Sequence, residues 1–245
     1  MTPPTIWNFI KFFTEEAHAD QFIAGNLYMN TLSHFKKLES ESDDGRPDST
    51  EAISHWWQPT DILMKLRVPG IGETEISSKD LAAPVSMSFT YHDYMHIFCL
   101  YTVHTTGFRI DGGKIERPGD RVEELRRQLW IDERCQNFGK YAVVIRPDLF
   151  LARVREALKG RKFAYRLVQY YDESTFHGTI PRKDIPFRKQ KRFSYQQEFR
   201  ICVYPKIMHN SPITINIGNI SNATGKMLSS QLNSQLDVKT EPVTA

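Results

Sequence analysis

The chain has 245 residues, of which 40% are hydrophobic and 12% are aromatic, so it can bury the core of one large domain or two small ones. Its formal net charge of +3 excludes a uniformly basic surface, so any affinity for nucleic acid has to come from a local patch. No apolar run approaches the roughly 20 residues that span a bilayer, and no secretory signal is visible. We therefore expect a cytoplasmic protein without a membrane partner.

Three cysteines, Cys99, Cys135 and Cys202, stand far apart, and two of them lie in apolar runs. This usage is typical of buried thiols in a reducing compartment. His92 and His96 have an H-x-x-x-H spacing, but no Glu follows the first His, and the segment reads as a loop and then a strand. The sequence therefore predicts no metal site.

The first forty residues predict two short strands, each followed by a helix. Thr14 is the expected N-cap of the first helix, and Gly25 is expected to end it. The strands cover residues 7–13 and 27–29, and the second helix runs from Thr31 to residue 38. An acidic, serine-rich surface loop follows.

Residues 84–90, P-V-S-M-S-F-T, predict a strand with hydroxyl groups on one face. Ser86, Ser88 and Thr90 alternate with Val85, Met87 and Phe89. Three hydroxyls in a row can bind a sugar or a phosphate. They can equally line a solvated face.

The rest of the chain mixes strands and helices in an irregular order. Strands are expected at residues 62–68, 141–145, 163–171 and 213–217, a strand and turn at 107–111, and helices at 120–134 and 147–160. Residues 94–104 form a long aromatic-rich segment. The order lacks the βα alternation of a doubly wound sheet, and neither G-x-G-x-x-G nor a Walker A loop is present. We predict an α+β fold with a split, largely antiparallel sheet. It forms one domain over residues 1–220, followed by a polar tail over residues 221–245.

The stretch from Lys189 to Tyr204, K-Q-K-R-F-S-Y-Q-Q-E-F-R-I-C-V-Y, predicts a strand from Phe193 onward. Side chains of a strand alternate, so Gln196, Glu198 and Arg200 would share one face. A Gln-x-Glu pair on one face is a candidate catalytic edge that holds a ribose hydroxyl and stabilises positive charge. The alternative is that Glu198 pairs with Arg200 or a neighbouring Lys on a solvated face.

A basic run precedes the Gln-x-Glu pair and ends beside aromatic residues. It contains Arg188, Lys189, Lys191 and Arg192. Cationic groups next to stacking rings are what a single-stranded nucleic acid needs, so this run is the candidate nucleic-acid contact. A solvated loop is the alternative.

The order of these pieces resembles the ADP-ribosyltransferase superfamily, whose members use NAD and fold as split α+β sheets around an NAD cleft. The third motif of that superfamily is a Glu on a late strand, often preceded two residues earlier by Gln or Glu, and it is similar to Gln196-Gln197-Glu198. Its second motif, a Ser-Thr-Ser-like strand, is similar to residues 86–90. Its first motif is commonly an Arg or a His on an early strand, where this chain has Lys11.

The resemblance implies a role for each matching residue. Glu198 would stabilise the oxocarbenium-like ribose and bind its 2′-hydroxyl, while Gln196 would orient the acceptor. Tyr28 would pack on nicotinamide. The NAD contacts implied are those of Lys11, Tyr28, Arg46, Ser86, Ser88 and Thr90, with Arg46 on the pyrophosphate.

Among members of the superfamily, the chain looks most like toxin-type transferases, including the RNA-modifying toxin of phage-defence toxin–antitoxin–chaperone systems. This implies transfer of ADP-ribose to a macromolecule, with RNA ranked before protein and DNA, and a protein antitoxin as partner. Two other functions stay open. One is a non-catalytic nucleic-acid-binding module, in which Trp56 and Trp57 stack on bases or a partner; the other is a metal-independent nuclease using His and Glu.

Overall fold

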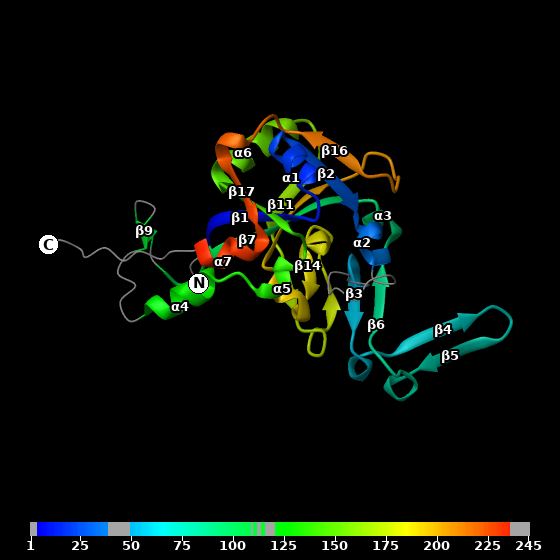
Figure 1. Cartoon of the computed structure of the whole chain (residues 1–245). Coiled ribbons are helices and arrows are strands. Elements are labelled where there is room, and N and C mark those ends of the chain that lie inside the picture. The colour runs from blue at the N-terminus through cyan, green and yellow to red at the C-terminus, as the bar shows by residue number, and fades with distance from the viewer. Residues whose placement is uncertain (1–3, 39–49, 109, 112–113, 116–120, 236–245) are drawn as a thin grey trace.

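The computed structural model describes residues 4–38, 50–108, 110–111, 114–115 and 121–235. Its centre is an eight-stranded sheet in which all pairs are antiparallel (Figure 1). The strand order is β11-β15-β7-β1-β10-β17, and β2 pairs with both β7 and β16. These strands are β1 (Thr5–Phe13), β2 (Asn26–Thr31), β7 (His96–Thr105), β10 (Tyr141–Ile145), β11 (Phe163–Leu167), β15 (Glu198–Val203), β16 (Ile213–Asn216) and β17 (Thr224–Leu228).

Helices cover the sheet, and the fold is α+β, as predicted. The helices are α1 (Glu16–Ile23), α2 (Leu32–Leu38), α3 (Thr90–Asp93), α4 (Val122–Leu129), α5 (Glu133–Gln136), α6 (Pro147–Ala157) and α7 (Leu232–Gln235). Short 3-10 turns occupy Pro59–Asp61, Ser78–Asp80, Ile185–Phe187, Lys191–Gln196, Ser221–Ala223 and Ser229–Gln231.

The largest hydrophobic core lies between the sheet and helices α1 and α6. Phe22 of α1 and Phe150 of α6 are both fully buried, with ring centroids 6.1 Å apart. Phe9 of β1 packs against Phe199 of β15 at 4.5 Å. Burial of several aromatic rings at one place supplies much of the driving force that holds the helices on the sheet.

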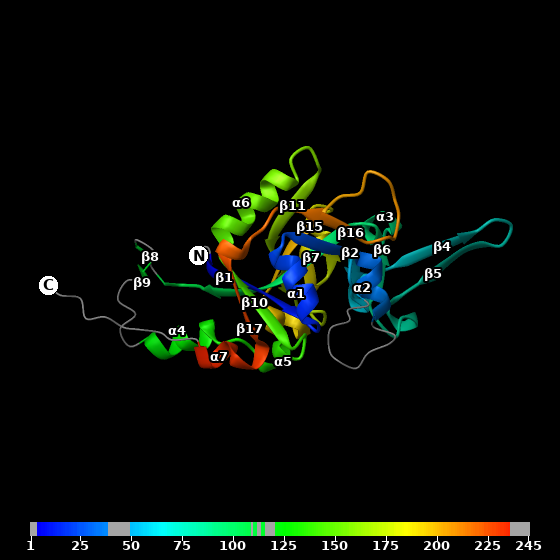
Figure 2. The same ribbon diagram turned by 45° about the horizontal axis from the view of Figure 1, so that its top comes forward.

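A second, smaller group of strands extends from this body. β3 (Ile53–Trp57) lies between β6 (Val85–Ser88) and β13 (Gly178–Thr179), and β4 (Met64–Val68) pairs with β5 (Gly72–Ile76). The β4–β5 hairpin projects away from the sheet in both views (Figures 1 and 2). The remaining strands are β8 (Ile110–Asp111), β9 (Lys114–Ile115), β12 (Gln169–Tyr171) and β14 (Arg188–Gln190); β8 pairs with β9, and β12 pairs with β14 in parallel.

The N-terminal elements follow the sequence pattern closely. Strands 7–13 and 27–29 are present within β1 and β2, and Gly25 ends α1 with a φ of 102°, the left-handed conformation that glycine adopts easily. Thr14, however, does not cap α1. The N-cap is Glu15, which makes no side-chain capping hydrogen bond.

Two long predicted elements are each divided in the structure. The expected helix 120–134 ends at Leu129, and α5 starts only at Glu133. The expected strand 163–171 is interrupted at Val168, whose N–H donates to the Glu198 carbonyl at 2.8 Å. Its first part, β11, pairs with β15, whereas its second part, β12, pairs with β14. Long-range strand pairing therefore overrides the local pattern in the strand, and between the two helices the Ile131 backbone hydrogen-bonds to the Asn233 side chain.

The segment after residue 220 is part of the domain, which corrects the predicted polar tail. β17 pairs with all five residues of β10 at the edge of the central sheet. Leu232, which follows it, is buried in a core cluster with Ile10 and Ala142. The segment looks like a tail in sequence because β17 is an edge strand whose side chains are largely exposed, so its composition is polar.

The burial of Leu232 generates a prediction about stability. Leu232 is 4% exposed and Leu228, in β17, is 38% exposed. We expect Leu232→Ala to lower the free energy of unfolding by about 2–4 kcal/mol, because the truncation leaves a cavity in the core. Leu228→Ala should change it by less than about 1 kcal/mol. Urea unfolding measures both values, and equal effects would contradict the inclusion of this segment in the core.

Candidate active site

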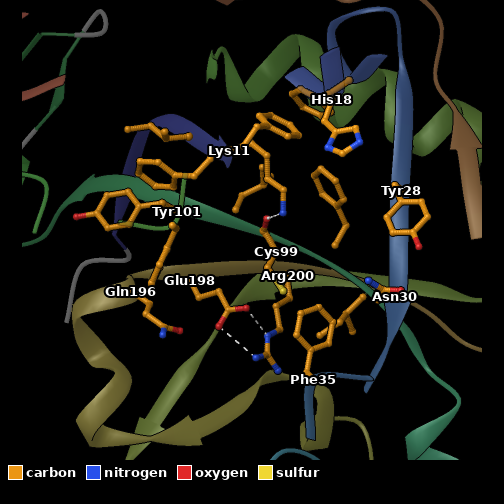
Figure 3. A pocket seen from close by; sticks show the side chains of 18 of the residues that line it. Lys11, His18, Tyr28, Asn30, Phe35, Cys99, Tyr101, Gln196, Glu198 and Arg200 are labelled. Carbon is orange, nitrogen blue, oxygen red and sulfur yellow. Dashed lines mark hydrogen bonds and ion pairs between the residues drawn. The ribbon is translucent and has the colours of Figure 1, made fainter. Parts of the chain in front are cut away.

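A cavity of about 740 Å³ opens beside the central sheet, and its wall includes residues of α1, β1, β2, β7 and β15 (Figure 3). This volume is in the range of small-molecule binding pockets. Glu198 and Gln196 lie on one side of the cavity, and Tyr28 and Asn30, both on β2, lie on the other. The structure thus brings together four residues predicted for the site: Lys11, Tyr28, Gln196 and Glu198.

Arg200 organises the charged side of the cavity. It is 1% exposed, and all five of its guanidinium N–H groups donate hydrogen bonds. Nε and Nη2 donate to the two carboxylate oxygens of Glu198, at 2.8 and 3.1 Å. Nη1 and Nη2 donate to the carboxylate of Glu51, and Nη1 also donates to the Pro186 carbonyl at 2.9 Å.

Lys189 completes this buried network. It is 5% exposed, and its ammonium donates to Gln196 Oε1 at 2.8 Å. The same Nζ atom lies 3.5 Å from Glu198 Oε2 and 3.6 Å from Glu51 Oε1. Two cations and two carboxylates therefore balance one another. Burial of charges is tolerated when each is paired and hydrogen-bonded in this way.

The network holds Glu198 in its ionised form. Burial alone would raise the pKa of Glu198, but Arg200 and Lys189 outweigh it and hold the pKa of this carboxyl well below its usual value. The reverse holds for Cys99, because burial and the neighbouring Glu198 raise the pKa of its thiol well above its ordinary range. Cys99 is therefore a protonated thiol that donates to Glu198, and it is a poor nucleophile at neutral pH.

The backbone before Glu198 differs from the predicted strand. Residues 191–196 form a 3-10 turn, Gln197 adopts a left-handed conformation with a φ of 39°, and the strand begins only at Glu198. Strand alternation therefore does not place Gln196 beside Glu198; their shared partner Lys189 does. The aromatic pattern suggested a strand because Phe193 is buried and Tyr195 packs against Phe138.

Glu198 and Arg200 do share a face of the strand, as predicted, but that face is buried. The alternative prediction of a solvated ion pair is correct about the pairing of Glu198 with Arg200. It is wrong about solvation, because both side chains are buried. The Glu198 backbone N–H donates to the Tyr170 hydroxyl at 2.9 Å. This contact from β12 helps to fix the start of β15.

Lys11 and Tyr28 both line the cavity. Lys11 Nζ donates to the Cys99 carbonyl at 2.8 Å and lies 4.6 Å from the centroid of the Phe98 ring. Tyr28 is largely exposed on β2, so its ring is open to a ligand. An ammonium group and an accessible ring that line the same cavity suit a ligand with an anionic part and an aromatic part.

The hydroxyl strand does not reach this cavity. Ser86 and Ser88 are exposed on β6, which pairs with β3 in the small sheet, and Thr90 is exposed at the start of α3. None of the three is among the described residues that line the cavity. The pattern of alternating hydroxyls therefore reflects a solvated face of the small sheet. Arg46 lies outside the described residues.

The basic run is not a continuous basic surface, because Lys189 is buried and cannot be a surface contact for nucleic acid. The contacts of Arg188, Lys191 and Arg192 stay predictions. Lys189 points inward, and Arg188 lies over the rings of Tyr171 and Phe176. Only Lys191 and Arg192 are exposed, and Lys191 faces Asp172 at 3.4 Å. The reason is that β14 pairs with β12, which carries the first half of the run into the interior.

Sequence reasoning missed Glu51 and the role of Lys189. Glu51 follows an acidic, serine-rich stretch in which a carboxylate looks solvated, and Lys189 sits among cations that look like a surface run. A third missed residue is His18, which lines the cavity from α1 (Figure 3). Nothing in the local sequence marks these residues, because their partners are distant in the chain.

No protein-family model, curated protein or solved structure matches this chain. Within the described residues, no helix is long and apolar enough to cross a membrane. In the same part of the chain, no group of three or more His, Cys, Asp or Glu side chains is placed to hold a metal ion.

Removing Arg200 should destabilise the fold strongly. Arg200→Met leaves the carboxylates of Glu51 and Glu198 buried with too little positive charge, so we expect a loss of about 3–5 kcal/mol in the free energy of unfolding. Arg126 is a suitable control because it pairs with Glu123 on the exposed face of α4, so Arg126→Met should change stability little. Chemical denaturation compares the two variants. A similar, small effect in both would show that the network contributes no stability.

The ionised Glu198 also makes stability depend on pH. Its pKa is lowered in the folded state, so its contribution is present above the ordinary value of 4.5 and is lost as the pH falls below it. We expect the free energy of unfolding to fall more steeply between pH 5 and pH 3, about the ordinary carboxyl range, in the wild type than in Glu198→Gln. Other carboxylates titrate in both proteins and cancel in the difference. Parallel pH profiles would contradict this prediction.

Proposed function

We propose that the chain is an NAD-dependent ADP-ribosyltransferase acting on a macromolecular acceptor, with RNA as the first candidate. The observation that carries the proposal is the ionised carboxylate of Glu198 on the wall of the cavity, with the amide of Gln196 beside it. The ADP-ribosyltransferase-like fold and the NAD cleft are part of the same proposal.

The reaction makes clear why such a carboxylate is needed. The bond between the nicotinamide nitrogen and ribose C1′ breaks with its electron pair on nicotinamide, an acceptor N–H or O–H bonds to C1′, and the acceptor's proton is released. Positive charge builds on the ribose as the bond breaks. A fixed, ionised carboxylate stabilises that charge without reorganising, and Arg200 fixes Glu198 through two hydrogen bonds.

The remaining side chains of the cavity suit a dinucleotide. The buried network is neutral overall. Lys11 therefore gives the cavity wall, as far as the structure describes it, a net positive charge, which favours an anionic pyrophosphate. Tyr28 and Phe35 line the cavity and offer rings on which nicotinamide or adenine can stack. Gln196 lies next to Glu198, where the acceptor would enter.

The macromolecular partners are proposed from the family resemblance. RNA ranks before protein as the acceptor, and a protein antitoxin would hold the toxin inactive in the cytoplasm. The competing proposal of a non-catalytic nucleic-acid-binding module relied on a continuous basic run. Burial of Lys189 interrupts that run, so the transferase is the better-supported proposal.

Two matched variants test the role of Glu198. Glu198→Gln and Glu51→Gln each remove one carboxylate from Arg200, but of the two only Glu198 is among the described residues lining the cavity. We expect Glu198→Gln to lower nicotinamide release from NAD by at least about 100-fold, the scale of losing one preorganised charge-stabilising group. Glu51→Gln should retain activity within about tenfold.

The assay incubates each protein with labelled NAD and with total RNA, DNA or cell lysate, and thermal denaturation confirms that both variants are folded. Label on RNA with the wild type alone would support the proposal and name the acceptor class. Equal losses in the two variants would make the carboxylates structural. Absence of nicotinamide release from the folded wild type would refute the transferase.

A further inference from the structure

We propose that one face of the small sheet, β13-β3-β6, binds a single-stranded RNA by stacking on its bases. This ring face consists of His55 and Trp57 of β3, Met87 of β6 and Phe89, which follows β6. The proposal concerns binding alone, so its outcome is independent of the proposed transferase activity.

Strand register places these side chains on one side of the small sheet. His55 lies opposite Met87, and residues that face each other across an antiparallel pair share a side. The ring centroid of His55 is 4.9 Å from that of Trp57 and 6.0 Å from that of Phe89. Phe89 is 51% exposed and Met87 is 43% exposed. Two half-buried rings therefore continue into two side chains that are open to solvent.

The other tryptophan of β3 lies on the opposite side of the strand. The indole N–H of Trp56 donates to the Glu173 carbonyl at 3.0 Å, and its ring centroid lies 6.5 Å from that of Tyr171. Trp57 is half-buried, and its indole N–H has no hydrogen-bond acceptor within the part of the chain that the structure describes. Of the two, Trp57 is thus the tryptophan placed to contact a ligand.

Exposed cations lie at one end of the ring face. The ring of His92 lies beside the rings of both Phe89 and Tyr91, with centroids 5.9 Å apart in each case. The Arg182 guanidinium lies 5.5 Å from the centroid of the Tyr91 ring. Arg182 and Lys183 are both exposed, and neither forms an ion pair with another described residue. Their charges can therefore contact the phosphates of a nucleic acid.

This combination of rings and cations favours RNA over an apolar protein surface as the occupant. An apolar surface would remove Arg182 and Lys183 from water without a partner, whereas phosphates neutralise them. Stacking rings beside cations are the groups that bind single-stranded nucleic acids. Thr179 adds an exposed hydroxyl on the same side, because it lies opposite His55. A hydroxyl can bond to the 2′-hydroxyl of RNA, which DNA lacks.

The ring face is connected to the candidate active site through β3. Glu51, just before this strand, accepts hydrogen bonds from Arg200, which also holds Glu198. Glu51 and His55 are four residues apart, so their Cα atoms lie within about 14 Å of each other. An RNA strand on the ring face would therefore be bound close to the network that fixes Glu198.

The test measures binding of a fluorescein-labelled oligouridine RNA by anisotropy, without NAD. Phe89→Ala and Trp57→Ala should each weaken binding about fivefold or more, the scale of losing one ring that stacks on a base. Trp130→Ala is the matched control, because Trp130 is also 51% exposed but lies at the end of α4. It should bind RNA as the wild type does.

The salt dependence of binding separates charge from stacking. Arg182→Gln should weaken binding and reduce the slope of log K against log salt by about 0.7, the value for one phosphate contact on a single strand. Phe89→Ala should leave that slope unchanged, because it removes no charge. Arg155→Gln is the control for charge, since Arg155 is exposed on α6 and has no ion pair among the described residues.

Three nucleic acids identify the occupant. Single-stranded oligouridine should bind more tightly than its duplex with oligoadenosine, whose bases are already stacked on one another, and more tightly than oligodeoxyuridine. Thr179→Val should reduce the preference for RNA over DNA. Equal binding of the duplex would overturn stacking as the mode of binding, and equal binding of DNA would overturn the choice of RNA.

Thermal denaturation checks that each variant is folded, and Phe89→Ala carries the test if Trp57→Ala does not fold, because Phe89 is half exposed. Unchanged RNA binding in Phe89→Ala, or an equal loss in Trp130→Ala, would overturn the inference. So would a dimer of the wild type that Phe89→Ala dissociates without affecting RNA binding, which would assign the ring face to a second copy of the chain. Nicotinamide release from NAD is measured separately and decides only the transferase.

Discussion

The guanidinium of Arg200 is the constraint on which the candidate site depends. A buried guanidinium requires a partner for each of its five N–H groups, and here two carboxylates and one carbonyl supply them. These partners come from three separate parts of the chain: Glu198 in β15, Pro186 in a 3-10 turn, and Glu51 just before β3. One side chain thereby ties the central sheet to the segment that leads into the small sheet and fixes the orientation of Glu198.

The charge balance of this network shapes the chemistry of the cavity. Because Lys189 and Arg200 offset Glu51 and Glu198, the Glu198 carboxylate is ionised although it is buried. Because the four charges of the network cancel, Lys11 sets the sign of the electrostatic potential on the cavity wall, as far as the structure describes that wall. A fixed anion at one side and an ammonium at another is a polarity that suits a dinucleotide whose ribose becomes cationic as its glycosidic bond breaks.

The same network links the two residues of the Gln-x-Glu pattern by an unexpected route. The left-handed Gln197 separates Gln196 from the strand, so neighbouring positions on a pleat do not account for their proximity. Lys189 brings them together by contacting both side chains. A residue that looks like part of a nucleic-acid-binding surface thus orients an amide inside the cavity, and the outer surface of the basic run is reduced to Lys191 and Arg192.

Features that depend on local alternation and local turns could be predicted from the sequence. These include the α+β class, the strand at residues 141–145, the start of α6 at Pro147 and the glycine that ends α1. It also pointed to Glu198, since a carboxylate in an apolar strand stands out. Contacts between distant segments determine that both faces of β15 are buried, that Glu51 reaches Arg200, that Lys189 points inward and that β17 joins the sheet. Those outcomes depend on pairing between segments far apart in the chain and on the desolvation of charges, neither of which leaves a local pattern.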